Sequence, residues 1–155
     1  MLIRTENRPL AYIFDVDGTL ANVDLYLHLV RGSNKDYDAF HEASMDALPN
    51  IEVVEMLNHA FFDQMHVIIV TSRMEKWRGL TSMWLAKNDI GHHALYMRKD
   101  NDNRSDYEVK KEILDNIKKH WRVIHAIDDN PNVIKLWEEN GIATTKIGTW
   151  DGDKS

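Results

Sequence analysis

A chain of 155 residues is long enough for one fold with a sizeable buried core, and 43% apolar with 28% charged residues is an ordinary globular composition. The sequence has no cysteine, which excludes disulfides, thiolate metal sites and a cysteine nucleophile. Nineteen basic against 25 acidic residues leave a net charge of −6, which argues against a broad electrostatic footprint on nucleic acid.

Apolar runs of strand length alternate with stretches of helical period along the chain. Strands are expected at residues 10–14, 67–70, 94–97, 123–127 and 143–147. Helices are expected at residues 51–61, 77–85, 109–117 and 131–137, the last of them opened by Asn130 as N-cap and Pro131. This alternation predicts an α/β fold, a Rossmann-like three-layer sandwich with a mostly parallel five-stranded sheet.

Residues 22–48 interrupt the first crossover from strand to helix. The segment is polar and aromatic, and it is too short for an independent domain. We expect it to form one or two small helices, a small cap insert on a single domain that spans residues 1–155. Tyr37 and Phe40 are expected to hold this insert against the domain.

No part of the sequence predicts secretion or a membrane span. Residues 1–8 have no apolar stretch of the signal-peptide kind, and apolar runs such as Val67–Val70 are far shorter than the ~20 residues that cross a bilayer. We therefore expect a soluble, cytoplasmic protein with no membrane partner.

Chemically useful side chains follow each predicted strand. Ligands of an open parallel sheet bind at the carboxyl ends of its strands, so these residues are expected to meet. Lys110 lies in the helix that precedes the fourth strand. The residues that end the strands are Asp15, Asp17, Gly18 and Thr19, then Thr71, Ser72 and Arg73, then Arg98, and finally Asp128 and Asp129.

The acidic pairs predict a metal site. Two carboxylates ~4 Å apart repel by roughly 4 kcal/mol at an effective dielectric constant of ~20, so four of them at one edge need a cation. Hard oxygen ligands favour Mg²⁺. Asp15 and Asp17 point to the same side, where one can attack phosphorus and the other can move a proton. Gly18 permits the sharp turn that follows.

These motifs resemble the haloacid dehalogenase phosphatase superfamily over nearly the whole chain. Asp15-Val16-Asp17-Gly18-Thr19-Leu20 is similar to its first motif, and Ile69-Val70-Thr71 to its second. Lys110 is similar to its third motif and Asp128-Asp129 to its fourth. A narrower resemblance, to the 3′-phosphatase domains of phage-type polynucleotide kinases, rests on Thr71-Ser72-Arg73, on Arg104-Ser105-Asp106 and on Leu136-Trp137 as well. No kinase P-loop sequence is present.

The resemblance implies a role for each of these residues. Asp15 is the implied nucleophile and Asp17 the general acid and base, and both are implied ligands of Mg²⁺, Asp17 through its backbone carbonyl. Thr71 would bind a phosphoryl oxygen and Lys110 would offset charge. Asp128 and Asp129 would complete the metal site, and the resemblance does not decide which of the two binds the ion directly. Substrate contacts are expected from Gly18, Thr19, Ser72, Arg73 and Arg98, and Asp106 is expected to orient Lys110.

Three functions follow from this pattern. The first is a Mg²⁺-dependent phosphomonoesterase that forms an aspartyl-phosphate and removes the 3′-phosphate from nucleic acid ends, as in DNA or RNA repair. The second is a phosphatase of free nucleotides or another small phosphomonoester, with the insert as a small lid. The third is a binding module on an inactive scaffold, against which the complete set of catalytic residues argues. The loop with Arg98, Lys99 and Arg104 offers local positive charge to a nucleic acid end. The sequence gives neither an oligomeric state nor a partner protein.

Overall fold

The computed structural model describes residues 6–151, which form a five-stranded sheet with helices on both faces. The strand order is β5-β4-β1-β6-β7, and every pairing in it is parallel. The predicted α/β class is thus confirmed, with a sheet that is parallel throughout. The strands are β1 (Leu10–Phe14), β4 (His66–Met74), β5 (Ala94–Arg98), β6 (Arg122–Asp128) and β7 (Ala143–Lys146).

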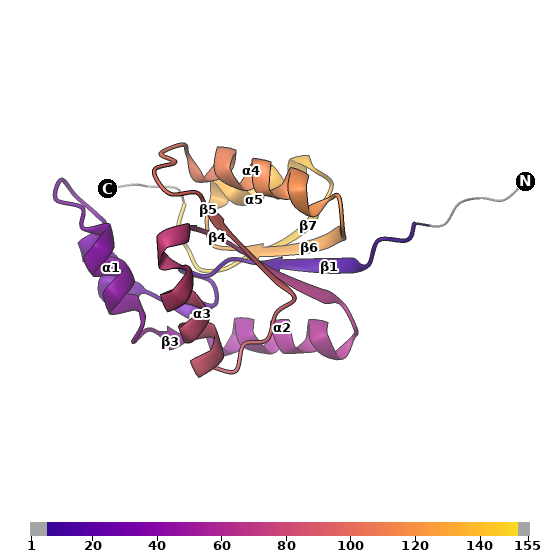
Figure 1. Cartoon of the computed structure of the whole chain (residues 1–155), viewed down its shortest axis with the longest axis horizontal. Coiled ribbons are helices and arrows are strands. Elements are labelled where there is room, and N and C mark those ends of the chain that lie inside the picture. Colours follow the sequence, from indigo (N-terminus) through magenta and orange to yellow (C-terminus); the bar gives the residue numbers. More distant parts are fainter. Residues whose placement is uncertain (1–5, 152–155) are drawn as a thin grey trace, which may run out of the picture.

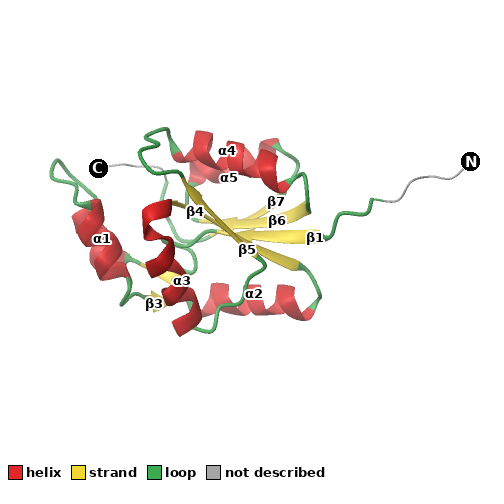
Figure 2. Cartoon of the chain, viewed as in Figure 1, coloured by secondary structure: helices red, strands yellow, loops and turns green. Residues whose placement is uncertain are grey.

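Two pairs of helices cover the sheet (Figure 2). On one side lie α2 (Ile51–Phe62) and α3 (Arg78–Lys87), and on the other lie α4 (Asp106–Ile117) and α5 (Pro131–Glu139). Asn130 caps α5 by accepting a hydrogen bond from the Asn132 amide, with Pro131 in the first turn, as predicted. None of the helices described is long and apolar enough to cross a membrane.

Alternate residues of the central strands enter two separate cores. Phe14 and Ile69 pack with Trp84 beneath α2 and α3, whereas Ile13 and Ile68 pack with Trp137 beneath α4 and α5. Both faces of β1 and β4 are buried, which explains why these strands read as continuous apolar runs.

The strand β4 continues four residues beyond the predicted end at Val70. Thr71 and Arg73 are both buried, and β4 keeps its pairing with β5 as far as Met74 and Arg98, through a register shift after Thr71. Thr71 and Arg73 do not end this strand, because their side chains form hydrogen bonds in its buried surroundings.

The insert, residues 22–48, is closed at its base by a short antiparallel pair of strands, β2 (Ala21–Asn22) and β3 (Leu48–Pro49). Between them lie the 3₁₀ helix η1 (Asp24–Leu29) and the helix α1 (Tyr37–Ser44), in agreement with the prediction of small helices. Phe40 is buried, but Tyr37 is 55% exposed, so the expectation that Tyr37 holds the insert in place is wrong. Figure 1 shows α1 beyond the carboxyl end of β1.

Candidate active site

Three carboxylates meet where β1 and β6 end. Asp15, Asp128 and Asp129 each place an oxygen atom within 4.8 Å of the others. Asp15 and Asp128 are buried. The tertiary structure therefore brings together the acids of the two central strands, as the strand-end argument predicts, and its all-oxygen donor set suits a hard divalent cation.

Lys110 bridges this acidic cluster from α4. Its Nζ lies 3.1 Å from Oδ1 of Asp15 and 2.8 Å from Oδ2 of Asp128, and its side chain is 3% exposed. The other oxygen of Asp128 accepts a hydrogen bond of 3.0 Å from the Asn130 amide. The other oxygen of Asp15 accepts one of 3.0 Å from the Thr19 hydroxyl. Both carboxylates are thus held in one orientation.

Protonation of the cluster reflects charge crowding in a buried place. Burial and then the Asp128 carboxylate raise the pKa of Asp15 well above its usual range, against the lowering effect of Lys110. The same two causes raise the pKa of Asp129 to about 7. Burial lowers the affinity of Lys110 for its proton, but Asp128 and Asp15 outweigh burial, so the pKa of Lys110 lies above its usual value. Three acids crowd around one ammonium, and the raised pKa values of Asp15 and Asp129 show that one positive charge does not satisfy them, which is the electrostatic condition that favours a bound cation.

Gly18 is required by two features of this turn. Its φ of +82° lies in the left-handed region, which side-chain-bearing residues rarely adopt. A Cβ atom at this position would lie 2.0 Å from Oδ2 of Asp129. The backbone of the first motif thus approaches the Asp129 carboxylate closely enough that only glycine fits.

Asp17 turns its carboxylate to Arg73 of β4. Nε of Arg73 donates to Oδ2 of Asp17 at 2.9 Å, and Nη2 donates to Oδ1 at 2.5 Å, which makes a bidentate ion pair. Burial alone would raise the pKa of Asp17, but the charge and the hydrogen bonds of Arg73 outweigh burial and hold that pKa below its usual value. The Asp17 side chain is 24% exposed, so it remains open to a ligand.

Two hydroxyls of β4 immediately precede Arg73 in the sequence. The Thr71 hydroxyl is buried and accepts a hydrogen bond of 3.2 Å from the Arg73 amide. The Ser72 hydroxyl is buried and has no hydrogen-bond partner among the described residues. A buried hydroxyl without a partner costs about 1–3 kcal/mol, so Ser72 is suited to receive a ligand oxygen. The roles of Thr71 and Ser72 with substrate stay predictions.

Arg98 donates most of its hydrogen bonds to nearby main-chain carbonyls. Its guanidinium donates to the carbonyls of Ser72, Asp102 and Arg104, and to the Asp106 carboxylate at 2.6 Å. Asp106 also accepts from the Asn130 side-chain amide at 3.3 Å. Arg98 and Asp106 therefore shape the loop that joins β5 to α4, and the substrate contact expected of Arg98 stays a prediction.

The positive charge of that loop is matched by acids. Arg104 pairs with Asp102 at 2.7 Å and with Glu112 at 2.6 Å, and Lys99 lies 3.7 Å from Glu112. A nucleic acid end would meet paired side chains here, which weakens the expectation of a basic loop.

Sequence reasoning missed two hydroxyls that hold Arg73. Nη2 of Arg73 donates to Ser44 of α1 at 3.1 Å, and Nη1 donates to Thr81 of α3 at 3.1 Å. Ser44 and Thr81 are fully buried. A lone serine or threonine on a helix carries no signal of such a role, because the contact depends on how the insert packs.

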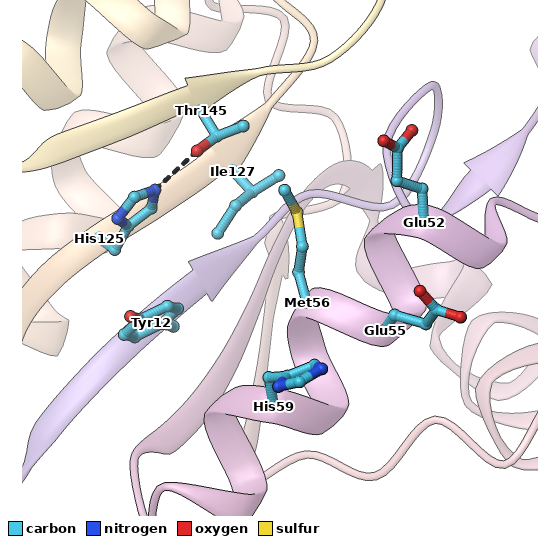
Figure 3. Close-up of a pocket in the computed structure, with 8 residues that line it drawn as sticks. All are labelled: Tyr12, Glu52, Glu55, Met56, His59, His125, Ile127 and Thr145. Atoms are coloured by element: carbon cyan, nitrogen blue, oxygen red, sulfur yellow. Dashed lines mark hydrogen bonds between the residues drawn. The ribbon is translucent and has the colours of Figure 1, made fainter.

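A hollow of about 430 Å³ lies on another flank of the sheet, beside α2 (Figure 3). The imidazole of His125 and the hydroxyl of Thr145 form a hydrogen bond of 2.8 Å in its wall. None of the predicted site residues, all of which the structure describes, lines this hollow. Its lining residues are Tyr12, Glu52, Glu55, Met56, His59, His125, Ile127 and Thr145.

The chain matches a family model described as the phosphatase domain of the polynucleotide kinase PNKP, over residues 9–151. The chain belongs to this family. The haloacid dehalogenase resemblance is thereby confirmed, and the chain is a phosphatase of that class, a phosphoric monoester hydrolase. Within this phosphatase domain, Asp15, Asp128 and Asp129 cluster at the edge of the sheet where the strand-end argument predicts them, and their catalytic roles stay predictions.

Relatives of this phosphatase domain are longer proteins. The chain is 28% identical over 144 residues to a protein of Autographa californica nuclear polyhedrosis virus, which is named as a putative bifunctional polynucleotide kinase/RNA ligase. The match covers 88% of this chain and 19% of that protein. Solved structures of the Pnkp1/Rnl/Hen1 complex contain a chain of 28% identity, with TM-scores of 0.81 and 0.80. The match covers 98% and 97% of this chain and 50% and 46% of the other, so the phosphatase domain spans at most half the length of these relatives.

The fold extends to more distant phosphatases. The class C acid phosphatase of Bacillus anthracis superposes with a TM-score of 0.70 over 92% of this chain and 67% of its own, at 10% identity. At that identity the likeness concerns the fold alone.

Proposed function

We propose that this phosphatase domain removes the 3′-phosphate from nucleic acid ends, through a covalent aspartyl-phosphate on Asp15. The observation that carries the proposal is the joint geometry of the first and fourth motifs, in which Asp15 is fixed by Lys110 and Thr19 beside two further acids. Membership of the PNKP phosphatase-domain family supports the choice of substrate.

Mg²⁺ is the cofactor that the donor set suits best. Asp15 and Asp129 would supply carboxylate oxygens, and the backbone carbonyl of Asp17 is a further expected ligand. Asp128 is fully buried between Lys110 and the Asn130 amide, whereas Asp129 is only partly buried, so we assign direct binding to Asp129 and a supporting role to Asp128. When bound, the cation would supply positive charge that holds Asp15 in its anionic form and attracts the phosphate.

In the first chemical step an oxygen of Asp15 attacks phosphorus and the bond from phosphorus to the 3′ oxygen breaks. Asp17 gives a proton to that oxygen, so the product end leaves as a neutral hydroxyl. Lys110, in contact with the nucleophile, and Arg73, in contact with the acid, provide the positive charge that a phosphoryl dianion needs beside carboxylates.

In the second step water attacks the aspartyl-phosphate. Asp17, now deprotonated, takes a proton from the water, and inorganic phosphate leaves while the Asp15 carboxylate is restored. The charge and hydrogen bonds of Arg73 hold the pKa of Asp17 below its usual value, which favours the carboxylate form that this second step needs. The same shift disfavours the protonated form, so Asp17 must take up a proton when the substrate binds in order to act as the acid of the first step.

The size of the insert supports a macromolecular substrate. Residues 22–48 form only η1, α1 and the strand pair at their base, and we propose that they act as a small cap. A cap of this size leaves the edge of the sheet accessible to the end of a polymer. Trimming a terminal phosphate also needs few backbone contacts, which is compatible with a net charge of −6.

A side-by-side measurement of kcat/KM with Mg²⁺ tests the substrate. The substrates are a 3′-phosphorylated oligonucleotide, the same oligonucleotide with a 5′-phosphate and a nucleoside 3′-monophosphate. We expect the first to be hydrolysed fastest. Equal rates on the mononucleotide would favour a phosphatase of small phosphomonoesters and overturn the proposed substrate. The Asp15→Asn variant is the matched inactive control.

A further inference from the structure

The helix α1 of the insert reaches the predicted general acid through one hydroxyl. Ser44, at the last position of α1, accepts a hydrogen bond of 3.1 Å from Nη2 of Arg73. The same nitrogen donates to Asp17 at 2.5 Å. A chain of two hydrogen bonds therefore joins the insert to the carboxylate that moves protons in the proposed reaction.

The Arg73 guanidinium is held at both of its ends. Nη1 donates to the Thr81 hydroxyl of α3, and Nη2 donates to the Ser44 hydroxyl of α1, while Nε and Nη2 face Asp17. A guanidinium is planar, with its donors in a fixed fork. Hydrogen bonds from both Nη atoms therefore prevent the guanidinium plane from rotating. They also set the direction from which Nε and Nη2 donate to the Asp17 carboxylate.

The Ser44 hydroxyl is itself oriented by its own helix. It donates a hydrogen bond of 2.8 Å to the carbonyl of His41, which leaves its lone pairs for Arg73. Ser44 is 1% exposed and Arg73 is 3% exposed, so water does not readily replace either partner. Serine at this position is needed for its hydroxyl because a methyl group there would leave a buried N–H donor of Arg73 without that acceptor.

We propose that Ser44 is a positioning residue for proton transfer: it fixes Arg73, and through Arg73 the orientation of the Asp17 carboxyl toward the leaving oxygen. The inference rests on the proposed function, in which Asp17 is the general acid. It gives the insert a part in the chemistry as well as in covering the site. Thr81 positions Arg73 in the same way, by accepting a hydrogen bond from Nη1.

Leaving-group dependence provides the test. An aryl phosphate such as p-nitrophenyl phosphate leaves readily without a proton, whereas the 3′-hydroxyl of a nucleotide does not. We expect Ser44→Ala to lower the rate of the first step on a 3′-phosphorylated oligonucleotide, measured in a single turnover, by about 10- to 100-fold, the scale of a misplaced catalytic group. On the aryl phosphate the rate of the first step, measured as the initial burst of p-nitrophenolate, should change by less than about twofold, because that leaving group needs no proton. The second step, in which Asp17 takes a proton from water, is common to both substrates and is kept out of the comparison.

Three variants accompany Ser44→Ala. Ser44→Thr keeps the hydroxyl and should restore most of the activity. Ser82→Ala removes an exposed hydroxyl from α3 and should leave both activities unchanged. Thr81→Val removes the other anchor while it preserves shape, and it should give the same leaving-group pattern, so the inference stays testable if Ser44→Ala does not fold.

A double-mutant cycle identifies the route of the effect. In the Asp17→Asn background, Ser44→Ala should cause no further loss on the oligonucleotide, because the residue through which it acts is gone. Equal losses in the first-step rate on both substrates, an unchanged first-step rate on the oligonucleotide, or additive losses in the double variant would each overturn the inference. If the wild-type domain hydrolyses aryl phosphate but no 3′-phosphorylated oligonucleotide, the proposed substrate fails instead. A nucleoside monophosphate then replaces the oligonucleotide in the same comparison.

Discussion

Replacement of Gly18 by alanine tests how closely the first motif must approach the Asp129 carboxylate. The new Cβ would lie 2.0 Å from Oδ2 of Asp129, whereas ordinary contact begins at 3.4 Å, so the carboxylate must move by 3.4 − 2.0 = 1.4 Å. Displacement of a catalytic group by ~1 Å can cost about 100-fold in rate. The left-handed backbone adds a cost of about 1–2 kcal/mol to folding.

Two other glycines separate these effects. Gly141 has a φ of +75° with nothing within 4 Å of a Cβ, so Gly141→Ala should show the cost in stability without loss of kcat. Gly79 lies in α3 with open space and no positive φ, so Gly79→Ala should be harmless. The assays are kcat on a 3′-phosphorylated oligonucleotide and thermal unfolding with and without Mg²⁺. We expect Gly18→Ala alone to lose about 100-fold in kcat and the stabilisation by Mg²⁺. A wild-type rate in that variant would refute the assignment of Asp129 to the metal site.

Three further predictions concern charge. Asp15→Asn should abolish turnover and keep the fold, as measured by circular dichroism, since it removes the nucleophile and relieves crowding; residual turnover above background would contradict the assignment. Lys110→Met should destabilise the fold by about 3–5 kcal/mol in urea unfolding, because it leaves buried carboxylates unpaired; a loss below about 1 kcal/mol would contradict a buried bridge. Burial, then His66 and His92, lowers the pKa of His93 in the fold. Because the unfolded chain then binds the proton first, stability should fall as pH drops below about 6.5, and His93→Gln should flatten that slope; an unchanged slope would contradict it.

Much of the fold follows from periodicity alone. Ile13 and Phe14 enter different cores because successive strand residues point to opposite faces, and this alternation places the two central strands in a sheet covered on both sides. The first polar residue after an apolar run is a weaker predictor of where the strand ends. Thr71 and Arg73 were expected to follow the strand but continue β4, since burial among polar partners removes the cost that ends most strands at such residues.

The acidic site was predictable because its members sit at strand ends, and the carboxyl ends of parallel strands meet at one edge whatever the details of packing. Asp15 and Asp128 needed only that rule to be placed together. The partners of the arginines needed the tertiary structure. Ser44 and Arg73 are 29 residues apart, and their contact depends on how the insert packs onto the rest of the fold. Arg98, whose contact with substrate stays a prediction, donates to loop carbonyls because buried main-chain oxygens need donors, and the path of this loop cannot be predicted from periodicity.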